Sequence, residues 1–522
     1  MTAPTIDAFL AHEPADLIGG SVRPLKGDAI RSHNPAAPDQ LVWQGGSNLQ
    51  HVDDAVAAAR AAQSAWARTP FEQRIEALLA FKKLAAERKE QIGQLIQLET
   101  GKAAWDAQAE AGILAGKIDI TLDDSAGSGR SRVAPFDLTL SPTRQGSTRF
   151  RPHGVMAVVG PFNFPAHLPN GHIAPALLMG NTIVFKPSDK TPAIGQLLAE
   201  MYLEALDTVG APKGVLNLVQ GGADIASRLV THESIDGILF TGSWPVGRRI
   251  LQANLDHPGR IVALELGGNN GALIMPDADL KATAIECARA AFITTGQRCT
   301  CTRRLVVHKD IARDLVPLIA KIASNLVIGD PGGVAGGPVF CGPLIREEPR
   351  QGALAFQQRL AAAGATPILE ATTMDTPTRG HFITPGMWKV DSFSRTENAH
   401  DAGCDIEVFG PILRVTECTS LDDGIAQVNA TRYGLAASIF TNDRTATDRF
   451  LAEARAGCVN VNAGTAGASG KLPFGGLGLS GNHRPAGSFA LDYCAYPVAS
   501  MVETAPGAAP APGMRFEDAW LS

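Results

Sequence analysis

The sequence predicts an α/β protein built on a doubly wound parallel sheet, and two observations support this prediction. Short apolar runs rich in β-branched residues recur along the chain, which is typical of buried parallel strands. Stretches of helical composition separate these runs at the spacing of βαβ units. The alternation occurs twice in 522 residues, which exceed the length of one ordinary domain, so we expect two α/β domains.

The first alternation lies before residue 267. Helical composition, interrupted by Pro70, covers residues 52–101. Buried strands are predicted at 155–160, 182–186, 215–219, 237–241 and 261–266, with helices at 194–206, 223–231 and 246–254. Ligands of such a sheet bind beyond the carboxyl ends of its strands.

The second alternation follows residue 266. Helices are predicted at 280–291, 311–325 and 350–363, and strands at 305–308, 412–416, 438–440 and 458–462. The polar stretch 145–151 follows a Ser/Gly-rich piece and is interpreted as a connection or an extended arm. The Pro/Ala-rich end of the chain is predicted to be a loosely held tail.

Composition argues against several classes of function. A net charge of −6 gives no support for nucleic-acid binding, and no apolar run approaches the ~18 residues that a bilayer requires. The N-terminus lacks the basic and apolar regions of a secretory signal. Eight cysteines without the spacing of a disulfide framework favour a reducing compartment. We therefore expect a cytoplasmic enzyme with neither nucleic acid nor membrane as a partner.

Residues 294–304, TTGQRCTCTRR, contain two cysteines, Cys299 and Cys301. Zinc sites commonly use Cys-x-x-Cys pairs, and this Cys-x-Cys has no second pair, so no metal is expected. A buried packing role is the common alternative for any free cysteine. Glycine and polar residues precede Cys299, and the adjacent Arg298 would favour its thiolate, so Cys299 is the candidate nucleophile.

Glu265 is the candidate base, because it ends a predicted strand in the motif LELGGNN. Gly267 and Gly268 would let the backbone approach other groups closely. A carboxylate at the mouth of a buried strand can have a raised pKa and accept a proton. From the residues alone, a solvated strand end or a helix cap is an equally good interpretation.

Two segments are candidate contacts for a dinucleotide. GSWPVG, residues 242–247, follows a predicted strand and opens a helix, where free N–H groups attract phosphate. Lys186 ends another strand, in FKPSDKTP, and could meet a ribose or phosphate. Both signals are weak alone, because many such turns only start helices and many strand-end lysines are only solvated.

Seven motifs together resemble the NAD(P)-dependent aldehyde dehydrogenase superfamily in order and spacing. They are GPFNFP, NTIVFKPSDKTP, ILFTGSWPVG, LELGGNN, TGQRCTC, EVFGP and PFGGLGLSG. The resemblance covers about residues 20–500. It implies a Rossmann-type NAD domain (1–129 and 151–265), a catalytic domain (266–479), a small oligomerisation element (130–150 and 480–502) and a tail (503–522). It also implies a homodimer or homotetramer.

The resemblance assigns roles to individual residues. Cys299 is similar to the nucleophile that attacks the aldehyde, Asn163 to the oxyanion-hole donor, and Glu265 to the base that activates the hydrolytic water. Lys186 would hold the adenosine ribose, and Glu407, beside Phe409, the nicotinamide ribose. The other implied cofactor contacts are Ser188, Asp189, Gly242, Ser243, Trp244, Pro245, Val246 and Gly247. Many NAD-preferring members carry a glutamate at the position of Asp189, whose charge should repel a 2′-phosphate, so NAD is the expected cofactor.

FPAHLPNGHIAPALLMGNT, SGNHRP and DYCAYPVAS resemble the branch that oxidises N-succinylglutamate 5-semialdehyde to N-succinylglutamate in arginine breakdown. The expected substrate is therefore a small anionic aldehyde. Arg298 and His167 are candidate contacts to its carboxylates, although structural hydrogen bonds are another interpretation of both. The alternatives are a different semialdehyde, a general aldehyde, or thioester hydrolysis with the same cysteine.

Overall fold

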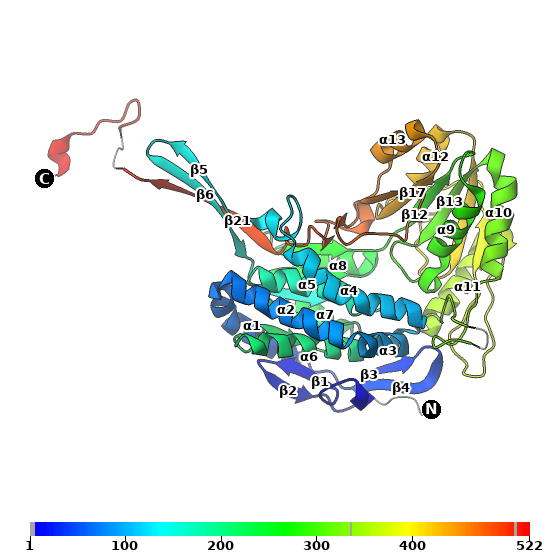
Figure 1. The fold of residues 1–522 in the computed structure, drawn as a ribbon, viewed down its shortest axis with the longest axis horizontal. Coiled ribbons are helices and arrows are strands. Elements are labelled where there is room, and N and C mark those ends of the chain that lie inside the picture. The colour runs from blue at the N-terminus through cyan, green and yellow to red at the C-terminus, as the bar shows by residue number, and fades with distance from the viewer. Residues whose placement is uncertain (1–5, 335–336, 506–508, 522) are drawn as a thin grey trace.

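The computed structural model describes residues 6–334, 337–505 and 509–521, arranged as two α/β halves and a projecting arm (Figure 1). The predicted fold class is confirmed. Each half is built on a seven-stranded sheet, and the strand orders are β11-β10-β7-β8-β9-β1-β2 and β14-β15-β16-β13-β12-β17-β18. In the part of the chain that is described, no helix has both the length and the apolar character needed to cross a membrane.

Five parallel strands form the first sheet at the positions that the apolar runs predict. They are β7 (Val155–Val159), β8 (Thr182–Lys186), β9 (Leu216–Leu218), β10 (Gly237–Thr241) and β11 (Ile261–Glu265). One edge departs from the parallel pattern: β1 (Ala15–Ile18) pairs antiparallel with β9, and β2 (Ser21–Pro24) with β1. The sequence pattern did not predict this edge, because β2 is exposed along its whole length and lacks an apolar run.

Helices cover both faces of the first sheet. The layer on one face contains α1 (Leu49–Arg68), α7 (Ala223–Val230) and α8 (Trp244–Ala253); the other contains α2 (Phe71–Glu87), α3 (Lys89–Thr100), α4 (Ala104–Leu122), α5 (His167–Leu178) and α6 (Pro192–Thr208). Val155 and Ala157 of β7 join the first layer, whereas Met156 and Val158 join the second, as the alternation of a strand requires. The predicted break at Pro70 separates α1 from α2.

The second half repeats this arrangement. Its strands are β12 (Asn270–Ile274), β13 (Thr302–His308), β14 (Thr366–Leu369), β15 (Gly386–Lys389), β16 (Ile412–Cys418), β17 (Ala436–Phe440) and β18 (Cys458–Val461). On one face lie α9 (Leu280–Phe292) and α10 (Lys309–Ser324), and on the other α11 (Glu347–Ala362), α12 (Leu421–Val428) and α13 (Arg444–Glu453). The predicted elements are present with shifted ends, and the strands β12, β14 and β15 and the helices α12 and α13 are additional.

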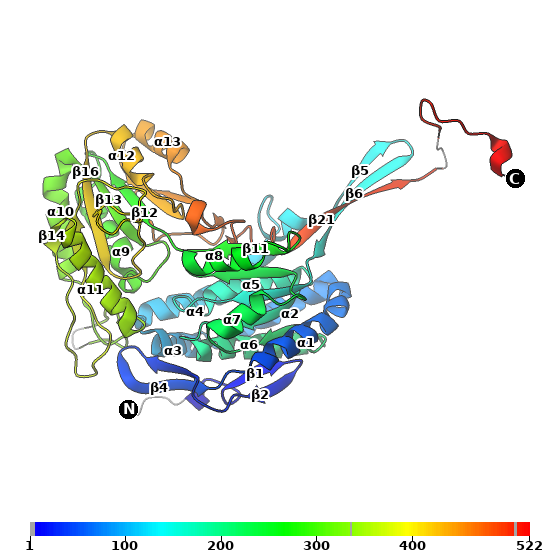
Figure 2. The same ribbon diagram turned by 180° about the vertical axis from the view of Figure 1, so that it is seen from behind.

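The predicted arm is a three-stranded antiparallel sheet that points away from both halves (Figures 1 and 2). It consists of β5 (Phe136–Ser141), β6 (Arg144–Pro152) and β21 (Ala495–Glu503). Residues 509–521 lie beyond it and are exposed throughout. The strands of the two large sheets fall within the segments predicted for the NAD and catalytic domains, whose functional division stays a prediction.

Two neighbouring leucines of α2 differ in burial, and their substitution tests how this helix packs. Leu78 is 1% exposed, whereas its neighbour Leu79 is 45% exposed. We expect Leu78→Ala to lower the free energy of unfolding by about 2–5 kcal/mol, because it leaves a cavity, and Leu79→Ala to change it by less than about 0.5 kcal/mol. Urea unfolding followed by circular dichroism would measure both. Equal shifts of the midpoint would contradict the packing of this helix.

Candidate active site

One cavity of about 1140 Å³ brings the two candidate chemical groups together, since Cys299 and Glu265 both line it. Most of the other lining residues come from α4, from the beginning of α5 and from segments between 466 and 487, which include β19 (Pro473–Phe474) and β20 (Ala486–Gly487). Glu265 is the last residue of β11, so the cavity lies beyond the carboxyl end of this strand. This is where ligands of doubly wound sheets bind.

The loop that carries Cys299 joins α9 to β13 through an unusual backbone. Thr294, Thr295 and Gly296 have φ angles of 54°, 55° and 73°, so two β-branched residues adopt the left-handed conformation. Such strain costs of order 1–3 kcal/mol per residue and needs surrounding contacts to hold it. Thr294 Oγ1 donates to Asp106 at 2.6 Å, and Thr295 Oγ1 donates to the Gly342 carbonyl at 2.7 Å.

Asn270 also fixes this loop, and the sequence reasoning did not assign it a role. Its amide nitrogen donates to the carbonyls of Cys299 and Cys301 at 2.7 and 2.8 Å, while its side-chain oxygen accepts from the Ala436 N–H. Cys301 itself is fully buried in a small apolar cluster, which is a packing role. The position of Asn270, at the end of the motif LELGGNN, was the signal available in the sequence.

Glu265 is buried, and neither carboxylate oxygen has a hydrogen-bond partner among the described residues. Burial raises the pKa of Glu265 to about 8, and the neighbouring Glu407 carboxyl adds to the rise, whereas the Cys299 thiol opposes it. A carboxyl group with this pKa exchanges protons near neutral pH, which suits a general base.

The expectation that Arg298 favours the Cys299 thiolate is wrong for the free protein. Burial, with the carboxyl groups of Glu265 and Glu407 close by, raises the pKa of the thiol well above its usual range. The Arg298 guanidinium is directed elsewhere: it pairs with Asp106 at 2.7 Å and donates to Thr294 Oγ1 at 2.8 Å. Arg298 lines the cavity, but its charge already has a partner.

Two other predicted residues, Asn163 and His167, lie at the cysteine loop and in the cavity. Asn163 follows β7 and donates its amide to the Gln297 carbonyl at 3.0 Å, so it contacts the cysteine loop two residues before Cys299. His167 begins α5 and lines the cavity. Burial and the nearby Lys117 and Lys102 lower the pKa of His167 to about 3, so its ring is neutral.

The two glycines after Glu265 allow the close approach that the sequence predicts. A Cβ on Gly267 would lie 1.8 Å from Glu407 Oε2, and a Cβ on Gly268 would lie 2.6 Å from the Cys299 carbonyl oxygen. The Gly268 N–H donates to Glu407 Oε1 at 3.0 Å. These contacts place the Glu407 carboxyl group against Gly267 and Gly268, the turn that follows Glu265 in the chain. Phe409 packs edge-on against Phe162, with ring centroids 5.8 Å apart.

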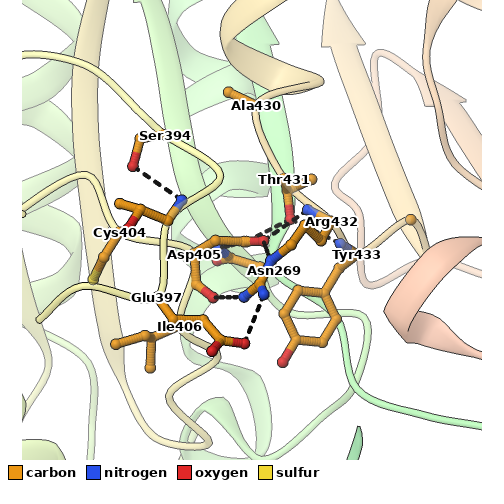
Figure 3. A network of polar contacts seen from close by, with 12 residues as sticks. Asn269, Ser394, Glu397, Cys404, Asp405, Ile406, Ala430, Thr431, Arg432 and Tyr433 are labelled. Carbon is orange, nitrogen blue, oxygen red and sulfur yellow. Dashed lines mark hydrogen bonds and ion pairs between the residues drawn. The ribbon is translucent and has the colours of Figure 1, made fainter.

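A buried carboxylate, Asp405, holds the segment that leads to Glu407 (Figure 3). It accepts from Asn269 Nδ2 at 2.8 Å, from Thr431 Oγ1 at 2.6 Å and from the Arg432 N–H at 2.7 Å. Arg432 adds an ion pair to Asp405 at 3.2 Å. Sequence reasoning missed this network, because its members are distant in the chain.

The predicted cofactor contacts meet at the carboxyl edge of the first sheet. Lys186 ends β8, is 4% exposed and donates to the Pro187 carbonyl at 2.8 Å; burial lowers its pKa to about 8. Ser188 is buried, and Asp189 lies 3.9 Å from Lys190 Nζ and 3.8 Å from Arg346 Nη1. Gly242 directly follows β10, and Ser243 precedes α8, whose first turn holds Trp244, Pro245, Val246 and Gly247.

Residues 23–497 match the Aldehyde dehydrogenase family. The chain is 44% identical to N-succinylglutamate 5-semialdehyde dehydrogenase of Caulobacter sp. (strain K31) over 487 residues, which are 92% of this chain and 95% of that protein. PnpE from Pseudomonas sp. WBC-3 is 28% identical with a TM-score of 0.87, covering 96% of this chain and 99% of PnpE. PnpE has also been solved in complex with nicotinamide adenine dinucleotide.

The glyceraldehyde-3-phosphate dehydrogenase GapN from Methanocaldococcus jannaschii DSM 2661, complexed with NADP, is 25% identical with a TM-score of 0.83. The match covers 92% of this chain and 99% of GapN. The resemblance carried by the seven motifs is thus confirmed over nearly the whole chain. The chain belongs to the aldehyde dehydrogenase family and is an aldehyde-oxidising enzyme.

Proposed function

We propose that this enzyme uses NAD to oxidise an anionic semialdehyde to its carboxylic acid through thioester chemistry on Cys299. The observation that carries the proposal is the shared cavity of Cys299 and Glu265, in which the buried carboxyl group of Glu265 has no hydrogen-bond partner among the described residues. The proposed substrate is N-succinyl-L-glutamate 5-semialdehyde, and the product N-succinyl-L-glutamate, a step of arginine breakdown. The name and 44% identity of the Caulobacter relative support this choice.

In the acylation step, the Cys299 sulfur forms a bond to the aldehyde carbon as the thiol gives up its proton to Glu265. The negative charge that develops on the aldehyde oxygen would be stabilised by the Asn163 amide and the Cys299 N–H. NAD, when bound, supplies the acceptor for the hydride that leaves this carbon, and a thioester remains on Cys299. Glu265 passes the first proton to solvent and then takes a proton from water, whose oxygen adds to the thioester carbon. The carbon–sulfur bond breaks, the acid leaves, and the Cys299 thiolate regains a proton from Glu265.

The chemistry of the donor set fits a dinucleotide. Among the described residues, no carboxylate lies within ion-pair distance of the buried Lys186 ammonium, which makes one hydrogen bond and has two further donors. The beginning of α8 lies at the same edge and offers backbone N–H groups to phosphate. Asp189 would accept from the adenosine ribose and disfavour a 2′-phosphate, and Glu407 would hold the nicotinamide ribose.

The arm fits a role in subunit pairing. Phe136, Leu138 and Leu140 alternate along β5, so their side chains share one face, and each is at least 50% exposed. An exposed apolar face of this kind commonly marks a protein–protein contact. A homodimer or homotetramer would bury it.

The substrate class is tested by NADH formation with a panel of aldehydes. The panel contains N-succinylglutamate 5-semialdehyde, glutamate 5-semialdehyde, succinate semialdehyde and hexanal. We expect kcat/KM for the succinylated compound to exceed that for hexanal by at least about 10-fold, as one charge-assisted contact provides. A flat profile would overturn the anionic substrate and leave the oxidation of aldehydes in place.

The two neighbouring cysteines give a matched test of the nucleophile. Cys299→Ala should abolish both NADH formation and hydrolysis of an activated ester, because no other residue supplies the attacking sulfur. Cys301→Ala should retain activity within about 3-fold, since truncating a buried side chain mainly affects stability. Ester hydrolysis by wild-type protein without any aldehyde oxidation would favour the thioester hydrolase instead.

The raised pKa of Glu265 predicts a pH dependence. Below pH 8 the carboxyl group is largely protonated and cannot accept a proton, so kcat/KM should rise with pH and level off above about pH 8. Glu265→Gln should lower kcat by about 10²- to 10⁴-fold and remove this rise, without weakening NAD binding measured by fluorescence. The exposed Glu76→Gln is the control. Full turnover by Glu265→Gln would remove Glu265 from the mechanism.

A further inference from the structure

Helix α4 supplies buried charged side chains at the cavity, and their charges do not balance. Asp106 pairs with Arg298 at 2.7 Å, and Glu110 pairs with Lys102 at 2.5 Å. These two carboxylates are therefore paired with two cations, of which Lys102 is buried and Arg298 is half-buried. A further buried cation, Lys117, lies about two helical turns beyond Glu110 on the same helix.

Lys117 lines the cavity and is only 3% exposed. Its ammonium donates to the Gly487 carbonyl at 2.8 Å, and no carboxylate of the described residues lies within ion-pair distance. An ammonium group has three N–H donors, so two remain for a ligand. Burial lowers the pKa of Lys117 to about 8, because a buried ammonium charge without a counter-charge is unfavourable.

The acidic residues that also line the cavity do not neutralise Lys117. Asp119, two residues further along α4, pairs with Lys82 at 2.5 Å on the exposed side. Asp123 accepts hydrogen bonds from the N–H and hydroxyl of Ser125. Glu265 lies at the chemical centre, with its pKa raised to about 8. Among the described residues, Lys117 is therefore the buried lining cation without an ion pair, whereas Lys471, the other lining lysine without one, is exposed.

His167 provides a second unused polar atom in the same cavity. Its Nδ1 is buried and has no hydrogen-bond partner among the described residues. The ring is neutral, so the tautomer with a proton on Nδ1 can donate one hydrogen bond without adding a charge. Lys117 is close enough to His167 to contribute to its lowered pKa.

We propose that Lys117, assisted by His167, binds a substrate carboxylate that is remote from the aldehyde carbon. One carboxylate oxygen would accept from the Lys117 ammonium and the other from the His167 ring. Lys117 would then take the specificity role that the sequence suggested for Arg298, whose charge is already used by Asp106. The inference deepens the proposed function and rests on it, because it identifies the group that selects an anionic semialdehyde over a neutral aldehyde.

The test compares wild type with Lys117→Met, which removes the charge and keeps a long buried side chain, and with Lys83→Met, an exposed control on α2. For N-succinylglutamate 5-semialdehyde, Lys117→Met should raise KM by about 10- to 100-fold with little change in kcat, as the loss of a charge-assisted contact predicts. For hexanal, kcat/KM should stay within about 3-fold. Lys83→Met should match wild type with both aldehydes.

Binding of the product, N-succinyl-L-glutamate, gives a readout that does not depend on turnover. Calorimetry should show its dissociation constant rising by the same factor in Lys117→Met. Lys117→Gln, which can keep a hydrogen bond to Gly487, serves if Lys117→Met does not fold.

The outcomes separate the inference from the function it rests on. Wild-type protein that does not prefer the anionic aldehyde would overturn the proposed substrate class. Wild-type preference that survives in Lys117→Met would overturn the role of Lys117 alone. An equal loss with both aldehydes would show that Lys117 is structural, and would also overturn the inference.

Discussion

The position of the candidate nucleophile depends on one side-chain amide. Asn270 binds the carbonyls of Cys299 and Cys301, and it does so from the first residue of β12, inside the second sheet. Its neighbour Asn269 binds Asp405, which holds the segment carrying Glu407. Consecutive residues therefore fix two loops that are over a hundred residues apart in the chain. The preceding Gly267 and Gly268 allow both loops to approach Glu265 closely.

The cavity contains polar groups that the fold leaves without partners. Glu265 has no hydrogen bond to its carboxylate, Lys117 has no counter-charge, and His167 has an unused ring nitrogen, in each case among the described residues. Buried groups of this kind cost free energy when the protein is free. The nearby pairs Arg298–Asp106 and Lys102–Glu110 show that the same helix, α4, can satisfy buried charges. The unsatisfied groups of this cavity therefore lie where a ligand would provide the missing partner.

The parts that the sequence predicted are those that depend on local pattern. Buried strands such as β7 and β10 appear as continuous apolar runs, and Pro70 marks a helix boundary. The exposed strand β2 has no such run, and β12 begins inside the motif LELGGNN with a polar residue, so neither was recognised. Glu265 and Cys299 were found through their motifs. Lys117 and Asp405 were not, because a lysine on a helix and an aspartate in a loop look like surface residues until tertiary contacts bury them. The expected effect of Arg298 on the Cys299 thiol was wrong for the same reason: the partner of Arg298, Asp106, lies 192 residues earlier.

The protonation states of Cys299 and Glu265 depend on each other, because the two groups are close together in one buried site. Burial raises the pKa of both groups, and each negative charge would raise the other further, so the free enzyme holds both protonated at neutral pH. A thiolate in this site becomes favourable only when its charge moves onto an aldehyde oxygen, which polar donors at the cysteine loop can bind. The site thereby couples formation of the reactive sulfur to the presence of its electrophile. The same burial that brings the pKa of Glu265 to about 8 also keeps the thiol in its less reactive form between turnovers.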